Sequence, residues 1–178
     1  MRFVVTGEWS RNRLLQVIVV LYSLYVGALW LTNALLYFSK MGLTPASVVG
    51  YYLGSEERFL PPRSYEGLLE VSHFHLFAMG MLLLVLTHLA LFVPVSPRAK
   101  AALVVVPFLS AFLDEGAGWL VRYVSPGFAV LKIAGFLLLQ ASLAALVLVS
   151  LWAVFAGGQG DTYAGGDEWD EDEEPGAP

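Results

Sequence analysis

The sequence predicts an all-α integral membrane protein: a four-transmembrane-helix bundle with a short interfacial helix in the loop between helices 1 and 2. Hydrophobic residues make up 57% of its 178 residues and charged residues only 14%, whereas a soluble domain carries about a quarter charged residues. The apolar residues fall into four long runs. Crossing ~30 Å of hydrocarbon takes about 20 helical residues, so each run is long enough to span a lipid bilayer.

The first two spans have recognisable ends. We expect helix 1 at residues 14–38, behind a short basic head (1–13). Its apolar stretch is too long for the core of a signal peptide. We expect helix 2 at residues 68–93, because Ser64 can cap its start and the prolines Pro94 and Pro97 stop it.

The last two spans are expected at residues 101–124 and 128–155. The third is the least hydrophobic, since it contains Pro107, Asp114 and Glu115, and the fourth is rich in Leu, Val and Ala. Both connections, VSPRAK and YVSPG, are short. Short connections make neighbouring helices antiparallel, so helices 2, 3 and 4 should form a meander.

Two segments are not expected to cross the membrane. The loop at 39–67 contains an expected interfacial helix at about 45–53, where Thr44 is the N-cap, Pro45 the first helical residue and Gly54 the stop. Tyr51 and Tyr52 suit a membrane interface, where the ring is buried and the hydroxyl stays wet. Residues 156–178 contain a GDEWDEDEE run and are expected to form a disordered acidic tail.

Composition narrows the function. The chain has no cysteine, which excludes disulfides and thiolate-ligated metal centres within it. It has no basic footprint for nucleic acid. The balance of Lys and Arg around the spans favours the inner or plasma membrane with both termini in the cytoplasm. The expected partners are lipid and other membrane subunits, or further copies of the chain.

All three histidines, His73, His75 and His88, lie on helix 2. His73 and His88 are about 60° apart around the helix, with Gly80 between them on one stripe, as in membrane b-type cytochromes. No other helix carries a histidine, so a b-type haem would have to be shared with a partner. His73 and His75 diverge by about 160° and cannot chelate one ion, so no metal site is expected. Alternatively, the histidines only hydrogen-bond within the bundle.

Asp114 and Glu115 are costly at membrane depth unless they are neutral, paired or facing a wet cavity. Lys132 enters the membrane at the same end and is expected to meet one of them. Arg122 lies on the same helix face as Glu115, about 10 Å farther along the helix axis. These residues form either a structural ion pair or a proton-handling group whose pKa values Arg122 and Lys132 set.

The meander brings most polar residues of the spans toward one membrane surface, with only His88 and Gln140 in the other half. We therefore expect a lateral pocket for an amphipathic molecule with a polar head, such as a quinone. Asp114 and Glu115 would take protons, and His73, His75 or His88, with Arg122 and Lys132, would bind the cofactor. The leading hypothesis is a membrane subunit of a quinone- or haem-linked electron-transfer complex, not catalytic alone. The rival is a non-catalytic anchor or assembly protein.

Overall fold

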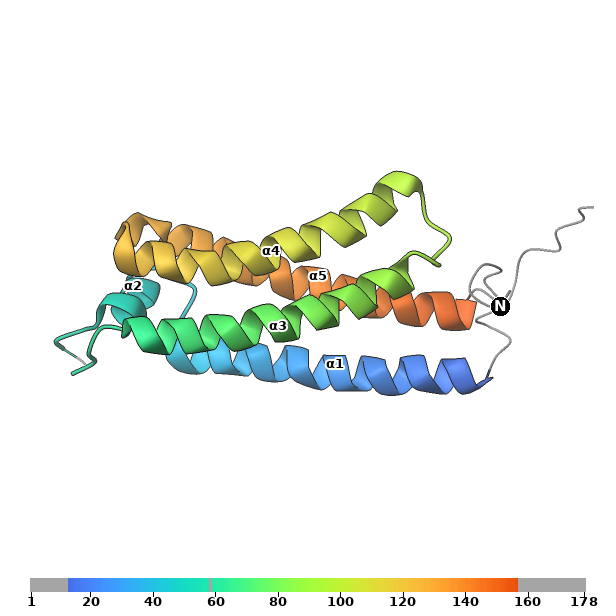
Figure 1. The fold of residues 1–178 in the computed structure, drawn as a ribbon, viewed down its shortest axis with the longest axis horizontal. Helices are drawn as coiled ribbons and strands as arrows, with labels where there is room; N and C mark the ends of the chain where they lie inside the picture. Colours follow the sequence, from blue (N-terminus) through green and yellow to red (C-terminus); the bar gives the residue numbers. More distant parts are fainter. Residues whose placement is uncertain (1–12, 58, 157–178) are drawn as a thin grey trace, which may run out of the picture.

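A computed structural model describes residues 13–57 and 59–156, and it confirms the predicted fold class. Four helices are long and apolar enough to cross a membrane. Figure 1 shows them as one elongated bundle, with a short helix α2 at one end. The described helices are α1 (Arg13–Lys40), α2 (Pro45–Leu53), α3 (Tyr65–Ala90), α4 (Pro97–Tyr123) and α5 (Ala129–Ala156), and a short 3-10 helix at Pro126–Phe128 precedes α5.

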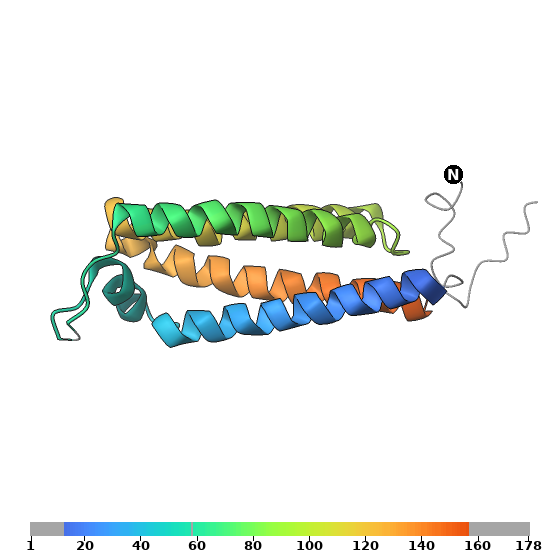
Figure 2. The ribbon, with the colours of Figure 1, turned by 60° about the horizontal axis from the view of Figure 1, so that its bottom comes forward.

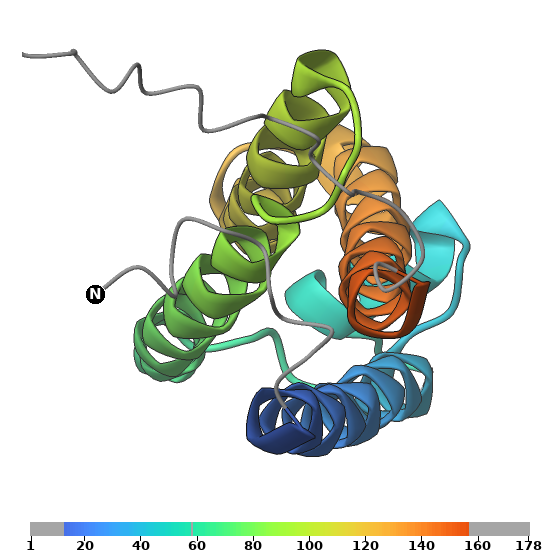
Figure 3. The same ribbon diagram turned by 90° about the vertical axis from the view of Figure 1, so that its right-hand side faces the viewer.

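The order of the helices around the bundle is visible along its axis (Figure 3). Helix α4 packs most extensively on α5, α1 packs on α5, and α3 packs on α4. In Figures 1 and 2 the start of α1, the α3–α4 connection and the end of α5 lie at one end, and α2 lies at the other. This is the predicted meander. The basic head and the acidic tail, apart from Arg13 and Ala156, lie outside the described residues, and so does Arg58.

Helices α1 and α5 meet along a regular antiparallel seam. The Tyr37 and Phe136 rings stack with their centroids 3.7 Å apart, and the Asn33 amide donates to the Gln140 side chain at 3.4 Å. Continuing this register pairs buried and partly buried residues at spacings of three and four, the spacing of a coiled-coil seam. The further pairs in this register are Val19 with Val154, Ser23 with Ser150 and Val26 with Val147.

The helix ends are set by capping groups, which explains why some boundaries differ from the predicted ones. Helix α3 begins at Tyr65, three residues before the predicted start, because the Ser64 side chain accepts from the Gly67 N–H. Helix α4 begins at Pro97 rather than at residue 101, because Ser96 caps it in the same way. Helix α3 ends at Ala90, before the predicted residue 93, because Pro94 has no backbone N–H to bond the Ala90 carbonyl four residues before it.

Helices α4 and α5 touch through their backbones at Gly135. A Cβ atom placed there would lie 2.8 Å from the Asp114 nitrogen and 2.9 Å from its Cα. Only glycine therefore allows this approach. Farther along, the first half of α4 bends away from the bundle (Figure 1). Pro107 causes this bend, because it lies inside the helix and has no backbone N–H to complete the helical hydrogen bonds.

We expect Gly135→Ala to lower the free energy of unfolding by about 1–3 kcal/mol, because overpacking forces two helix backbones apart. Thermal unfolding in detergent measures this loss. Gly27→Ala is the matched control, because a Cβ atom at that helical glycine meets nothing within 4 Å. Equal melting temperatures for the two variants would contradict the close α4–α5 contact.

Candidate functional site

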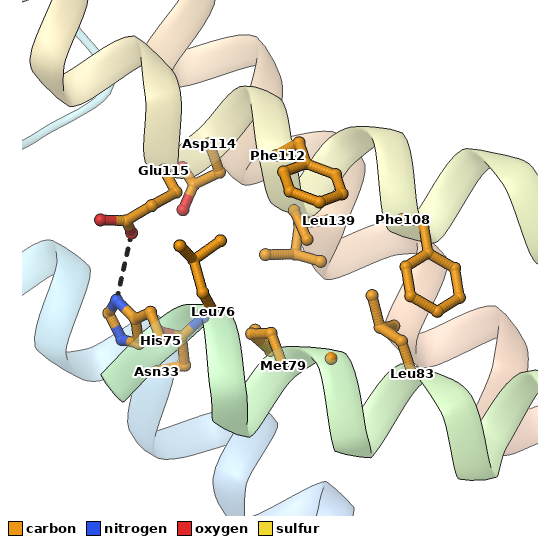
Figure 4. Close-up of a pocket in the computed structure, with 12 residues that line it drawn as sticks. Asn33, His75, Leu76, Met79, Leu83, Phe108, Phe112, Asp114, Glu115 and Leu139 are labelled. Atoms are coloured by element: carbon orange, nitrogen blue, oxygen red, sulfur yellow. Dashed lines mark hydrogen bonds and ion pairs between the residues drawn. The ribbon is translucent and has the colours of Figure 1, made fainter. Parts of the chain in front are cut away.

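A pocket of about 80 Å³ lies at the centre of the bundle and is lined by all four long helices. Most of its wall is apolar, and four polar side chains, those of Asn33, His75, Asp114 and Glu115, share it. Figure 4 shows the two carboxylates side by side on α4, facing α3. His75 is ten residues from the start of α3, so the pocket lies about 15 Å from that helix end. Exposed Leu76 and Phe112 border it, so it opens sideways toward lipid.

The Glu115 carboxylate is held from one turn of α3. The Ser72 hydroxyl donates to Oε1, and Nδ1 of His75 lies 3.3 Å from Oε2 (Figure 4). Residues three apart share a helix face, which explains why Ser72 and His75 reach the same group. The Trp119 indole, one turn after Glu115, donates to the Ser72 hydroxyl at 2.8 Å. Both carboxylate oxygens of Glu115 therefore have a partner on α3, which fixes the orientation of the side chain.

Asp114 has a different partner. The Lys132 ammonium donates to Oδ1 of Asp114 at 2.7 Å and to its backbone carbonyl at 2.9 Å. The sequence left open which acid Lys132 would meet, and the structure identifies Asp114. The contact at Gly135, one turn after Lys132, brings the two helices close enough for it. The side chains are 9% and 17% exposed for Lys132 and Asp114, so this is a nearly buried ion pair.

A second polar layer joins α1 to α5 beside the pocket. Asn33 donates to the Gln140 side chain, and the Trp30 indole donates to the Gln140 carbonyl at 2.9 Å. The sequence analysis placed Gln140 in the opposite half of the membrane, and this was wrong. The antiparallel seam puts Gln140 level with Asn33, a register that no local pattern in α5 reveals.

Three of the predicted site residues lie away from the pocket. Arg122 does not reach Glu115, because its Nε donates to the Arg63 carbonyl in the loop at 2.8 Å. His73 and His88 are exposed, each against a neighbouring ring of its own segment, Phe74 and Phe92. Their roles as cofactor ligands stay predictions. The pocket brings together Asp114, Glu115 and His75, and Lys132 joins it through Asp114.

Helix α2 covers this end of the bundle more tightly than a helix lying free at the surface. Tyr52 is buried, and a Cβ atom at Gly118 would lie 2.6 Å from its hydroxyl. The predicted wet hydroxyl is therefore wrong for Tyr52, since α4 covers it. Burial raises the pKa of Tyr52, and the nearby Asp114 charge raises it further, so this hydroxyl stays protonated at neutral pH.

The arrangement offers hydrogen-bonding groups beside an apolar wall. Nδ1 of His75 faces Glu115, and His75 has no other hydrogen bond in the described part of the chain, so its Nε2 is available as a hydrogen-bonding group. One amide N–H of Asn33 is also free after its bond to Gln140. In residues 13–57 and 59–156 no three His, Asp or Glu side chains converge as metal ligands would.

Comparison with known proteins agrees with the architecture. A family model described as a transmembrane helical domain matches residues 42–160. That range covers α2 to α5 and begins just after α1 ends. No curated protein and no solved structure matches the chain.

Proposed function

The chain belongs to the Aq_1264_TM family of transmembrane helical domains, and we propose that it is the quinone-binding membrane subunit of an electron-transfer complex. One observation carries this proposal: the central pocket, in which an oriented histidine–carboxylate pair faces an apolar cavity open to lipid. A quinone has two ring oxygens and a hydrophobic tail. Such a molecule reaches the pocket through the membrane without crossing water.

The size of the pocket fits a head group rather than a whole molecule. Drug-sized ligands occupy cavities of about 300–1,000 Å³, whereas this pocket measures about 80 Å³. One ring can enter between Met79 and Phe108, two of the apolar lining residues, while the tail stays among the lipid chains. The mixture of an apolar wall and a few polar groups is typical of small-molecule sites.

The polar residues supply what a quinol needs to lose its protons. Oxidation of a quinol releases two protons and two electrons. His75 accepts the hydrogen bond of one hydroxyl through Nε2 and takes its proton, while the Glu115 carboxylate bonded to the same ring stabilises the imidazolium. The second proton goes to the Glu115 carboxylate, which also lines the pocket. Asn33 orients the ring through its free amide N–H. The electrons pass to a redox centre of a partner subunit, because this chain contains no cysteine and its described His and acidic residues do not converge.

A haem held by this chain alone does not fit the described residues. Bis-histidine ligation needs two imidazoles facing each other across the macrocycle. His75 is turned toward Glu115, and His73 and His88 lie on exposed positions of the same helix. A haem shared with a partner subunit would need that partner's ligand, so the proposal assigns the pocket to quinone.

We expect Gly80→Leu to weaken quinone binding at least tenfold while leaving the protein folded. Gly80 lines the pocket, and a Cβ atom there meets nothing within 4 Å. A leucine side chain at this position would therefore occupy the part of the pocket that the quinone ring is proposed to fill. Binding of a short-tailed quinone to the detergent-purified protein measures the effect. The measurement combines quenching of tryptophan fluorescence with thermal unfolding.

The control is Gly27→Leu, which enlarges a helical glycine that also has free space around it and does not line the pocket. It should bind quinone as the parent does. If Gly80→Leu binds equally well, the pocket is not the binding site.

The second candidate is a non-catalytic anchor or assembly protein. The buried Lys132–Asp114 pair favours it, because a paired carboxylate ties α4 to α5 and needs no ligand. The two functions differ in one measurable respect. An anchor purified in detergent binds no quinone, and its polar residues affect only stability.

A further inference from the structure

Two arginines lie together at the end of the bundle that carries α2. Arg63 precedes Ser64, the cap of α3, and Arg122 lies in the last turn of α4. They are joined, because the Arg122 Nε donates to the Arg63 carbonyl at 2.8 Å. This bond, between residues 59 positions apart in the sequence, places the Arg122 guanidinium against the backbone of Arg63.

Each guanidinium rests on an aromatic ring. The Arg63 Cζ lies 4.1 Å from the centroid of the Tyr51 ring, and the Arg122 Cζ lies 5.2 Å from that of Tyr123. Contacts of this kind hold a cation in position and leave its charge uncompensated. Tyr65 and Trp119 continue the same cluster, with ring centroids 5.5 Å apart. Aromatic residues of this kind mark the level of the lipid head groups.

Neither arginine has an acidic partner in the described part of the chain. The two ion pairs found there, His75–Glu115 and Lys132–Asp114, lie inside the bundle. A guanidinium has five N–H donors, and only the Nε of Arg122 is used. The unused donors are therefore available to an anion from outside the described chain.

The position and the donors define that anion. Arginine binds phosphate with two parallel hydrogen bonds, and planar guanidinium groups held on rings are already oriented for this. The first backbone N–H groups of α3, which follow Arg63 directly, add the positive end of a helix dipole. Basic pockets between transmembrane helices at head-group level bind anionic lipids. The first turn of α3 carries one acidic residue, Glu66, and among the described residues it forms no ion pair with either arginine.

We infer that Arg63 and Arg122, resting on Tyr51 and Tyr123, form a binding site for a phosphate group at the membrane interface. The phosphate is supplied either by the head group of an anionic phospholipid or by free phosphate. A bound lipid would clamp the loop to the end of α4. The site is separate from the central pocket and does not depend on what that pocket binds.

The test uses the full chain purified in detergent. Phosphatidylglycerol, phosphatidylcholine and inorganic phosphate are titrated in separate arms, with the melting temperature and native mass spectrometry as readouts. Arg63→Gln is the main variant, because it removes one guanidinium and keeps the carbonyl to which Arg122 donates. Its affinity for the phosphate ligand should fall about tenfold or more, the effect of losing a charged hydrogen bond. Arg122→Lys keeps the positive charge but loses the planar guanidinium that makes two parallel hydrogen bonds. This variant should also bind the phosphate ligand more weakly.

The control is Lys40→Gln, which removes an exposed cation in the last turn of α1, at the same end of the bundle. Binding of phosphatidylglycerol that Arg63→Gln weakens and Lys40→Gln keeps supports the site, with a lipid as its source. The same pattern with inorganic phosphate supports the site with free phosphate as its source. The proposal is overturned if phosphatidylglycerol and inorganic phosphate bind no better than phosphatidylcholine, or if Arg63→Gln and Lys40→Gln lose affinity equally.

Discussion

Replacing His75 by alanine is expected to weaken quinone binding roughly 10- to 100-fold while the protein stays folded and inserted. The side chain is 47% exposed and has a single hydrogen-bond partner, Glu115. Removing the imidazole ring of His75 therefore removes few packing contacts. A ligand that loses a hydrogen bond to a charged or polarised group loses about 1.5–3 kcal/mol, which corresponds to roughly a 10- to 100-fold rise in Kd. Titration with a short-tailed quinone, followed by thermal unfolding, measures both quantities.

Glu115→Gln tests the same pair from the other side. The amide keeps the shape of the carboxylate and can still accept from Ser72, whose hydroxyl donates to Oε1 in the parent. The free energy of unfolding should therefore change little. What the variant loses is the negative charge that stabilises a protonated His75. Quinone affinity should fall, and proton-coupled quinol oxidation by the assembled complex should stop.

His73→Ala is the matched control, because it removes an exposed imidazole two positions away on the same helix. It should bind quinone like the parent. The electron-transfer hypothesis is wrong if the parent binds no quinone and both His75→Ala and Glu115→Gln melt markedly earlier. In that outcome the polar residues only hold the bundle together, and the anchor function replaces the proposal.

Most of the fold could be predicted because its signals are local. The N-caps Thr44 and Ser64 act as the sequence indicates, each accepting from a backbone N–H three residues on. Run length alone defined the four spans. The start of α4 was placed too late, since the cap at Ser96 with Pro97 behind it was interpreted as part of a tight turn.

The site could be predicted only in part, because its geometry depends on how the helices pack. The predicted meander put Asp114, Glu115 and Lys132 at one end of the membrane, but which acid Lys132 meets came only from the structure. The roles of Ser72 and Trp119 depend on the rotation of α3 against α4, which no local pattern records. Arg122 was assigned to the acids because it lies on one helix face with Glu115. Its long side chain reaches the loop instead.

Lys132→Met is expected to cause the largest loss of stability, about 3–5 kcal/mol, because it leaves the Asp114 carboxylate buried without its cation. The ammonium makes two hydrogen bonds to Asp114, one to the side chain and one to the backbone. Both groups are nearly buried. Thermal and denaturant-induced unfolding in detergent measure the loss, and Lys40→Met, which removes an exposed lysine, is the control.

The double variant Asp114→Asn/Lys132→Met measures how much of the stability loss comes from the interaction between the two charges. Removing both charges of a buried pair is often neutral, whereas removing one is costly. The double variant should therefore recover most of the stability that Lys132→Met loses, and the coupling energy from the double-mutant cycle should exceed about 1 kcal/mol. If Lys132→Met unfolds no earlier than Lys40→Met, Asp114 is not a buried anion held by Lys132. Asp114 would then be able to exchange protons with a ligand in the pocket that it lines. In the proposed mechanism only Glu115 and His75 have that role.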